Sequence, residues 1–290
     1  MPRLSTFSIA AFDPDDGAWG VAVASKFPAV GAVVPWAKSG AGAVATQAMG
    51  NTSFGARGLE MMAAGRSAPE TLDALLADDV GREHRQVGAV DAAGRAATFT
   101  GKECLAWAGG RTGEHFAIQG NILTGPEVVD AMAQAFRSDS GDLADRLMAA
   151  LLAGDRAGGD RRGRQSAALF VVKPQAGYGG FNDIWLDYRV DDDPDPVPKL
   201  VELLAIHRLY FGKSPADDQI PIAGEVATQL QRIMASLGYY GGPVSGAYDE
   251  TTRSALMAFI GNENFEDRTD FAAGQIDRPV FDYLLRKFGG

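Results

Sequence analysis

The first fifty residues constrain this chain most, because they combine short β-like runs, many glycines and a few polar residues. Residues 5–50 read STFSIAAFDPDDGAWGVAVASKFPAVGAVVPWAKSGAGAVATQAMG. Residues 6–12 form an apolar, β-branched and aromatic run that ends at Asp13-Pro14-Asp15-Asp16-Gly17, where Asp and Gly favour tight turns. Residues 19–25 predict a second strand, so the two runs form a hairpin. We expect the chain to be organised around this block of strands.

Hydrophobic periodicity predicts strands, two helices, strands, two helices and strands, in that order. Further strands are predicted at 30–35, 41–47, 86–91, 96–100, 115–119, 166–172 and 185–190, and helices at 53–64, 68–76, 125–136 and 142–152. Strands do not alternate singly with helices, which argues against a Rossmann or barrel fold. We therefore expect an α+β fold, a four-layer αββα sandwich with the helices outside and two sheets inside.

The last third of the chain predicts a separate helical domain. Pro194, Pro196 and Pro198 mark a boundary, a helix follows at 199–211, and GKSPADDQIPI at 212–222 has the composition of a linker. Helices are then predicted at 226–237, 250–260 and 279–287. We expect one domain over 1–211, a linker over 212–222, and a small all-α three-helix domain over 223–290.

Composition and charge narrow the function classes. The net charge of −10 argues against nucleic acid as a partner, because binding a phosphate backbone needs clustered Lys and Arg. No apolar run approaches the ~20 residues that cross a bilayer, and the N-terminus has no apolar run typical of a signal peptide. We expect a cytoplasmic protein that does not bind membranes. Cys104 is the only cysteine, which excludes an intrachain disulfide.

We expect neither a metal nor a cofactor. His84, His115 and His207 fall on different predicted elements, which argues against a zinc site. The acidic residues of the 183–193 segment could coordinate calcium, but their spacing matches no loop motif, and a solvated acidic segment is the simpler interpretation.

Four polar residues of the N-terminal block are candidates for chemistry: Thr6, Ser8, Lys26 and Gln47. Thr6 and Ser8 lie two apart on one strand, so their side chains share a face. A hydroxyl nucleophile needs a base, which in one class of enzyme is the protein's own α-amino group. Lys26 follows the second strand of the hairpin, near enough to reach the end of the first, and a buried lysine would lower the pKa of the nucleophile. Alternatively, these residues only pack in a sheet and an ordinary loop.

A second cluster is the segment GDRRGRQS at 159–166. Its arginines beside a glycine-rich turn could clamp a carboxylate or phosphate, because guanidinium groups bind such anions in a bidentate manner. The alternative is a solvated loop whose arginines pair with acids. Asn121, at the end of a predicted strand, could donate to an oxyanion or could be a turn residue.

Several stretches resemble the DUF1028 family from about Thr6 to Phe211. They are TFSIAAFDP, GVAVASKFPAVGAVVPWA, GAVATQA, FGARGL, EHRQVGAVDAAGRAATFTG, QGNIL and GGDRRGRQSAALFVVKP, in order and nearly without gaps. The family is bacterial, largely uncharacterised and placed with the Ntn-hydrolase-like folds. The resemblance implies an Ntn-hydrolase-like αββα sandwich and an amide-bond hydrolase whose N-terminal nucleophile is Thr6.

The N-terminus departs from that family. Members commonly begin Met-Thr-Phe-Ser, whereas five residues precede Thr6 here. The mechanism requires a free amine on Thr6. Either the chain is processed, or the start codon is misassigned, or the fold no longer performs this chemistry.

The first hypothesis is therefore an Ntn-type amidohydrolase that cleaves an amide bond of a small molecule or peptide. Thr6 would attack, its amine or Lys26 would assist, and Asn121 or backbone amides would hold the oxyanion. The residues expected to bind substrate are Ser8, Gln47, Asp160, Arg161, Arg164, Gln165 and Ser166, with Arg161 and Arg164 gripping a substrate carboxylate. The alternative is a non-catalytic ligand-binding or assembly protein on the same fold.

Residues 220–288 resemble a peptidoglycan-binding domain found with this family, through VATQLQRIMASLGYYGGPVSGAYDETTRSALMAFIG. The resemblance implies peptidoglycan fragments as partners and a cell-wall association as a third hypothesis. Tyr239 and Tyr240 form an aromatic turn that either stacks on sugar or fills the helix bundle. Because αββα sandwiches often pair through their helical layers, we also expect a homodimer.

Overall fold

The computed structural model describes residues 6–212 and 214–289 and divides into two compact units between Leu203 and Leu204. This division falls inside the helix α5 (Pro196–Phe211), eight residues before the expected boundary after residue 211. The prolines that suggested a boundary lie at the start of this helix, because the first helical turn needs no N–H donor from Pro196 or Pro198.

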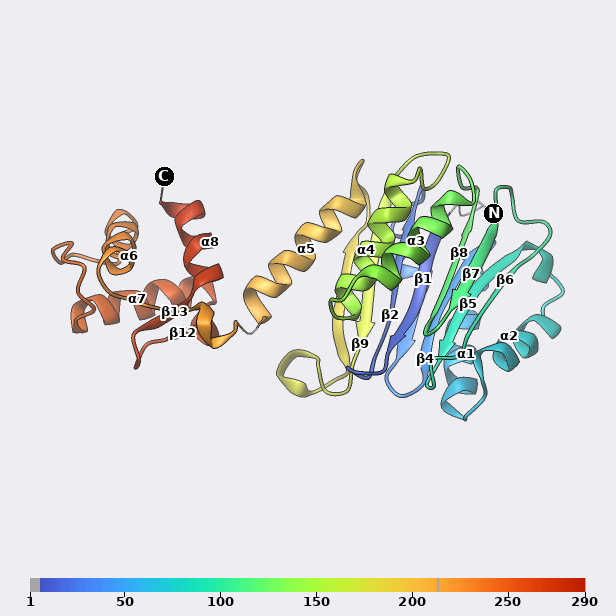
Figure 1. Cartoon of the computed structure of the whole chain (residues 1–290), viewed down its shortest axis with the longest axis horizontal. Helices are drawn as coiled ribbons and strands as arrows, with labels where there is room; N and C mark the ends of the chain where they lie inside the picture. Colours follow the sequence, from blue (N-terminus) through green and yellow to red (C-terminus); the bar gives the residue numbers. More distant parts are fainter. Residues whose placement is uncertain (1–5, 213, 290) are drawn as a thin grey trace. The chain divides into compact units, whose positions relative to one another are not determined.

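The first unit contains two antiparallel sheets (Figure 1). The six-stranded sheet has the order β10-β9-β2-β1-β8-β7, formed by β1 (Thr6–Asp13), β2 (Ala18–Ser25), β7 (Gly109–Gly113), β8 (Phe116–Asn121), β9 (Ser166–Val172) and β10 (Ile184–Val190). The four-stranded sheet has the order β3-β4-β5-β6, formed by β3 (Pro35–Lys38), β4 (Gly42–Ala48), β5 (Arg85–Asp91) and β6 (Ala96–Thr100). The predicted hairpin of β1 with β2 is confirmed, and β5 pairs with β6 and β9 with β10 in the same antiparallel manner.

Helices cover the outer face of each sheet. The helices are α1 (Ser53–Ala63), α2 (Ala68–Ala77), α3 (Glu127–Ser138) and α4 (Leu143–Arg156). Helices α1 and α2 pack on the four-stranded sheet, α3 and α4 pack on the six-stranded sheet, and β1 and β8 face β4 and β5 across the centre (Figure 1). The predicted α+β class is confirmed, and the layers run helix, sheet, sheet, helix.

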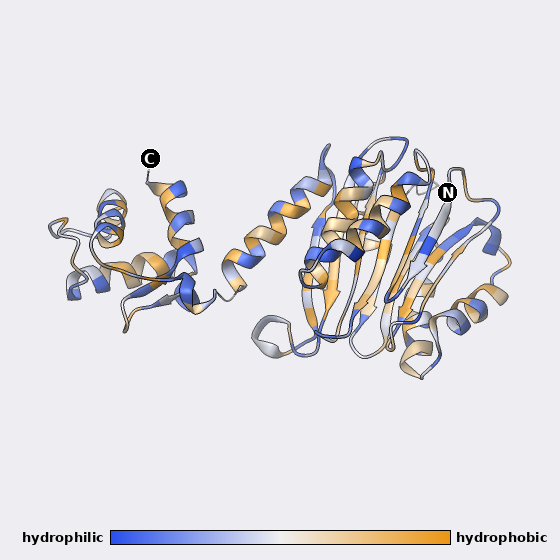
Figure 2. Cartoon of the chain, in the orientation of Figure 1, coloured by the Kyte–Doolittle hydropathy of each residue, from blue (hydrophilic) through white to orange (hydrophobic). Residues whose placement is uncertain are grey.

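Each strand of the hairpin β1–β2 is buried on both faces, which explains its nearly continuous apolar sequence (Figure 2). Ala10 and Val23 pack between the two sheets, where small side chains allow a close approach. Phe7 lies on the opposite face of β1, against Gly154 of α4. The alternation of β1 therefore directs Thr6 and Ser8, like Ala10, into the space between the sheets.

One strand prediction in this unit is wrong, and one strand was missed. Residues 30–35 are not a strand, because Ala29 adopts a left-handed conformation with φ 50° and Val30–Ala32 continues as a 3-10 turn. Strand β3 begins only at Pro35. Strand β7 was not predicted, since its sequence GGRTG has no apolar run. Its glycines are needed for a close approach: a Cβ on Gly110 would lie 2.6 Å from the carbonyl oxygen of Ile118.

The second unit is a helical bundle with a small sheet. Its elements are α6 (Glu225–Ser236), α7 (Glu250–Glu263), α8 (Arg278–Phe288), β11 (Gln219–Pro221), β12 (Thr269–Asp270) and β13 (Gln275–Asp277), with the sheet order β11-β13-β12. The predicted helices are present, but the all-α expectation is wrong. Strand β11 lies in the segment that was expected to be a linker. The sequence did not predict this strand, because its pairing partner β13 is more than fifty residues further along the chain.

The aromatic turn of the second unit fills the bundle. Tyr240 is buried and its hydroxyl donates to the carbonyl oxygen of Pro243 at 2.9 Å. Tyr239 packs on Phe259 with a centroid distance of 5.5 Å. These contacts favour the packing interpretation of the turn over stacking on a sugar.

No helix within residues 6–212 and 214–289 has both the length and the apolar character needed to cross a bilayer.

Candidate functional site

A row of polar side chains crosses the six-stranded sheet at the end where β1 begins. Thr6 pairs with Asn121 of β8 on one side and with Ser25 of β2 on the other, and Ser25 pairs with Ser166 of β9. Directly opposed residues in antiparallel strands point to the same face. All four side chains therefore enter the space between the two sheets, and all four are buried.

A second polar row lies two residues further along the strands. Ser8 pairs with Gln119 of β8, and both are buried. The opposite sheet contributes Gln47 of β4, which pairs with Gln86 of β5. The two sheets thus bring polar side chains together at one end, whereas the remainder of their interface is apolar.

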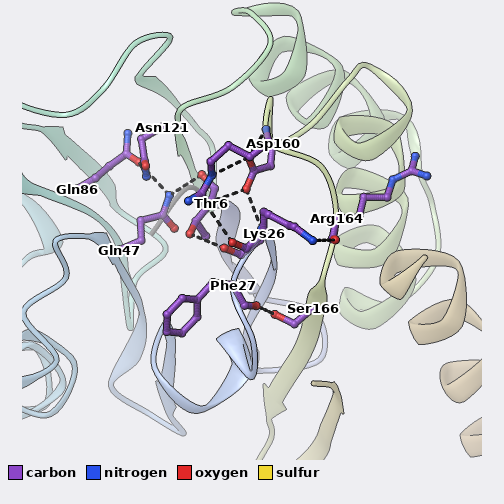
Figure 3. Close-up of polar contacts among 11 residues, drawn as sticks. Thr6, Lys26, Phe27, Gln47, Gln86, Asn121, Asp160, Arg164 and Ser166 are labelled. Carbon is purple, nitrogen blue, oxygen red and sulfur yellow. Dashed lines mark hydrogen bonds and ion pairs between the residues drawn. The ribbon is translucent and has the colours of Figure 1, made fainter. Parts of the chain in front are cut away.

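Hydrogen bonds connect these side chains across the sheets, and Figure 3 shows Gln47, Gln86 and Asn121 beside Thr6. The Thr6 Oγ1 and Ser25 Oγ atoms are 3.2 Å apart. Gln47 Nε2 donates to the Thr6 carbonyl oxygen at 3.2 Å and to Gln86 Oε1 at 2.9 Å. The Ser8 hydroxyl donates to Gln47 Oε1 at 2.6 Å and accepts from Gln119 Nε2 at 2.6 Å. The site is therefore a continuous buried network around Thr6.

Gln86 is the centre of this network. Its Oε1 accepts from Gln47 and from Asn121 Nδ2, each at 2.9 Å. Its Nε2 donates to Thr100 Oγ1 at 2.9 Å and to the carbonyl oxygen of Gly120 at 2.7 Å. Since buried amides are costly to leave without partners, Gln86 fixes Gln47 and Asn121 on either side of Thr6. An Nδ2 hydrogen of Asn121, expected to serve an oxyanion, is directed at Gln86.

Non-glycine residues with left-handed backbone conformations lie next to the site. Ala48 follows Gln47 with φ 65°, and Ile122 follows Asn121 with φ 52°. A β-branched residue at positive φ is a strained outlier, and such strain concentrates at functional sites. Both residues thus lie directly before a left-handed turn that ends their strand, β4 for Gln47 and β8 for Asn121, at the end of the sandwich where β1 begins.

Lys26 does not lie where the sequence suggested. It is exposed, and its ammonium group donates to the carbonyl oxygen of Arg164 at 3.2 Å (Figure 3). The chain turns outward after Ser25, so a buried lysine beside Thr6 is not observed. The backbone N–H of Lys26 instead donates to Asp160 Oδ2 at 2.7 Å, which fixes the end of β2.

The Gly-rich loop before β9 is tied to the same edge of the sheet. Asp160 is buried and pairs with Arg162 at 3.3 Å, an arginine that the sequence did not single out. Arg164 pairs with Asp155 at 2.8 Å and with Asp195 at 3.0 Å, so its guanidinium group is already engaged. Arg161 is exposed, and within the part of the chain that the structure describes its guanidinium group has no hydrogen bond or ion pair.

The remaining predicted residues of this loop have structural contacts. Gln165 donates to Asp192 at 3.0 Å. The Ser166 hydroxyl donates to the Phe27 carbonyl oxygen and accepts from Val30 N at 3.1 Å. Ser166 thereby anchors the turn after β2, beside the row that contains Thr6.

An ion pair supports the ends of β4 and β5. Arg85 Nε donates to Asp79 Oδ2 at 2.9 Å, and Arg85 also donates to the carbonyl oxygen of Met49. The hydrogen bond from Arg85, with further ones from Gly81 N and Asn51, lowers the pKa of Asp79 to about 2. This pair positions the chain directly beside Gln47 and Gln86. Nearby, burial raises the pKa of the Cys104 thiol, which makes it a poor nucleophile.

Two hollows are lined by strand neighbours of Thr6, although Thr6 itself lines neither. One has a volume of about 260 Å³ and is lined by Phe7, Ala24, Ser25, Asp155, Arg156, Gly158, Asp160, Gly163, Arg164, Pro196 and Val197. The other, of about 10 Å³, is lined on one side by Asn121 and Ile122. Ser25 and Asn121, the strand neighbours of Thr6, thus each line a hollow, although both residues and Thr6 are buried.

The sequence indicated only part of the site. Thr6, Ser8, Gln47 and Asn121 are brought together as predicted, whereas the predicted arginines lie at its edge. Ser25, Gln86 and Gln119 were missed. A signal existed for Gln119, which lies two residues before Asn121 on one strand, the same spacing that relates Thr6 to Ser8. The expected removal of residues 1–5 concerns a segment that lies outside the described residues.

Fold and site define a four-layer sandwich with a buried, hydroxyl- and amide-rich end. The family model described as "Family of unknown function (DUF1028)" matches residues 6–200, and the chain belongs to this family. A model described as "Putative peptidoglycan binding domain" matches residues 210–284.

One solved relative covers most of the chain. The crystal structure of protein SPO2555 from Silicibacter pomeroyi, also matched by the DUF1028 model, is 31% identical, covers 77% of this chain and 92% of its own, and superposes with a TM-score of 0.64. No curated protein matches the chain.

Proposed function

We propose that the first unit is an Ntn-type amide hydrolase whose nucleophile is Thr6, generated when the five preceding residues are removed. The observation that carries the proposal is the position of Thr6. It is the first residue of a central strand, and its hydroxyl lies 3.2 Å from Ser25 Oγ in a buried polar network between two sheets. A cut before Thr6 would create an α-amino group on the residue that bears this hydroxyl.

The chemistry requires a base, and the α-amino group of Thr6 is the group that the proposal assigns. The Thr6 oxygen would attack the substrate carbonyl carbon while its proton passes to this amine, and the amine would then protonate the departing nitrogen. Water would hydrolyse the resulting ester. Gln47 holds the Thr6 carbonyl oxygen, so the nucleophile would be oriented before substrate binds.

Lys26 and the arginines have revised roles in this proposal. Lys26 supports the site through its backbone N–H and Asp160, not through its ammonium group. The hollow beside Ser25 is lined by Asp155, Arg156, Asp160 and Arg164 and would hold the polar end of a small amide or peptide. Arg161 is the arginine of this loop that remains available for a substrate carboxylate.

A chain that begins Met-Thr6 tests the proposal, since removal of the methionine exposes the amine. We expect it to hydrolyse members of a panel of aminoacyl p-nitroanilides, whereas the intact chain should be inactive. Mass spectrometry of rapidly quenched reactions should detect the acyl group on the peptide that contains Thr6. If the N-terminus is confirmed as Thr6 and no acyl adduct or turnover appears on any substrate, the hydrolase assignment fails.

A second candidate is a non-catalytic protein that binds peptidoglycan fragments through its second unit. The family match over 210–284 favours it, as does a groove of about 770 Å³ that is lined in part by Ile206, Leu209, Arg278, Tyr283 and Arg286. Its arginines would suit the carboxylates of the stem peptides. We expect purified peptidoglycan to retain the intact chain, with Arg278→Glu/Arg286→Glu weakening retention and Arg57→Glu, in the first unit, leaving it unchanged. Wild-type protein left entirely in the supernatant would remove this candidate.

A further inference from the structure

Strand β10 is the outermost strand of the six-stranded sheet among the described residues. It runs for seven residues, IWLDYRV, with Ile184, Asp187 and Arg189 exposed. The opposite edge strand, β7, has five residues and lies against β6 of the second sheet. In the smaller sheet, β3 has four residues and begins with Pro35, which has no N–H to offer. A long exposed edge is a template for pairing with another strand.

The charges of β10 are self-complementary. Asp187 and Arg189 lie on one face, and their side chains are 2.8 Å apart within the strand. When a strand pairs antiparallel with its own copy around a two-fold axis at Tyr188, residue 187 faces residue 189 of the copy, and residue 189 faces 187. Both contacts then join opposite charges, and Leu186 faces Val190 on the other side of the sheet.

Neighbouring registers lack this complementarity. Centring the two-fold axis on Asp187 opposes two aspartates, and centring it on Arg189 opposes two arginines. Like charges placed directly opposite destabilise strand pairs, whereas opposite charges stabilise them by roughly 0.2–1 kcal/mol. Edge-strand charges of a single sign would repel those of a second copy in every register. Because Asp187 and Arg189 have opposite signs, they favour pairing with a second copy of β10 in one register.

The loop before β10 supplies the apolar area that a strand pair alone lacks. Tyr178 and Phe181 are 88% and 93% exposed on the glycine-rich turn between β9 and β10. A bulge between Ile184 and Leu186 interrupts the regular register of β10. In the Tyr188-centred register, Leu186 faces Val190 of the copy, so the loop that precedes each β10 lies beyond Val190 of the other. Aromatic residues bury about 150–250 Å² each, so the four of a dimer contribute roughly 600–1,000 Å², which approaches the area of a specific interface.

We propose that the chain forms a two-fold symmetric homodimer in which the β10 strands of two copies pair antiparallel around Tyr188, so that the six-stranded sheet continues across both. The expected dimer is thus joined at a sheet edge, not at the helical layers. The interface lies on the edge strand farthest in the sheet order from β8, and it does not depend on the hydrolase proposal.

Charge exchange tests the register with the intact chain. Sedimentation velocity at micromolar concentrations should show a dimer for the wild type. Asp187→Arg should give a monomer, because two arginines would then oppose each other, and Asp187→Arg/Arg189→Asp should restore the dimer. Arg57→Glu, on the distant helix α1, serves as the charge control and should leave the dimer unchanged, and circular dichroism checks that each variant is folded.

A cysteine cross-link provides an independent test. Opposed residues in an antiparallel pair have Cα atoms about 4.5–5.5 Å apart, within the range of about 4.4–6.8 Å that a disulfide spans. In a Cys104→Ser background, Tyr188→Cys should form a covalent dimer under mild oxidation, and Asp73→Cys, on an exposed face of α2, should not. A monomeric wild type, a dimer that persists in Asp187→Arg, or no cross-link at position 188 would each overturn the proposal.

Discussion

Replacing Thr6 by alanine in a chain that begins at this residue is expected to abolish amide hydrolysis, with a loss of about 10⁴-fold or more in kcat/KM. The physical reason is that the hydroxyl oxygen forms the covalent intermediate, and no other hydroxyl carries an α-amino group beside it. Ser25 Oγ lies 3.2 Å from Thr6 Oγ1, but Ser25 is an internal residue of the chain. It therefore has no free α-amino group that could act as its base. Initial rates on the same p-nitroanilide panel measure the effect.

Serine at position 6 is the matched control. Thr6→Ser keeps the oxygen and the amine, and we expect it to retain activity within roughly 100-fold of the wild type. Alanine should cost only about 1 kcal/mol of stability, because it removes one buried hydrogen bond and one methyl group. Equal activity in the alanine and serine variants, with both folded by circular dichroism, would exclude Thr6 as the nucleophile.

Replacing Gln86 by leucine is expected to lower the free energy of unfolding of the first unit by about 3–5 kcal/mol. Leucine has a similar volume but no polar atoms, so the substitution isolates the hydrogen bonds. It would leave Asn121 Nδ2 and Gln47 Nε2 without an acceptor that they now share, and it would remove the donor to the carbonyl oxygen of Gly120. Each such buried group costs about 1–3 kcal/mol when its partner is lost.

Tryptophan fluorescence measures this effect specifically, because all four tryptophans of the chain lie before residue 204 and so report on the first unit. The midpoint of thermal unfolding should fall by roughly 10 °C. Gln134→Leu makes the same chemical change on an exposed position of α3 and should alter stability by less than about 0.5 kcal/mol. A decrease of less than about 1 kcal/mol in the free energy of unfolding of Gln86→Leu would show that the hydrogen bonds of Gln86 do not stabilise the polar end of the sandwich.

The local elements were largely predictable, because short-range chemistry decides them. Asp13 to Gly17 ends β1 and starts the hairpin. Ser67 and Glu70 form a capping box at the start of α2, a pattern that depends only on a serine and a glutamate three residues apart. Strands whose apolar pattern is weak were not predictable: the glycines of β7 and the three-residue strand β11 are ordered by partners that are remote in sequence.

The sequence by itself determined that Thr6 and Ser8 point to one face, since the period of two along a strand requires it. It also determined the helix, sheet, sheet, helix order, through the sequence of apolar patterns. Only the tertiary structure decided which groups surround Thr6. Strand register places Ser25 and Asn121 beside it, and the packing of one sheet on the other brings Gln47 and Gln86 to it. Only the tertiary structure turned Lys26 outward, because Asp160 and Arg164, more than 130 residues away in sequence, bind the chain where β2 ends.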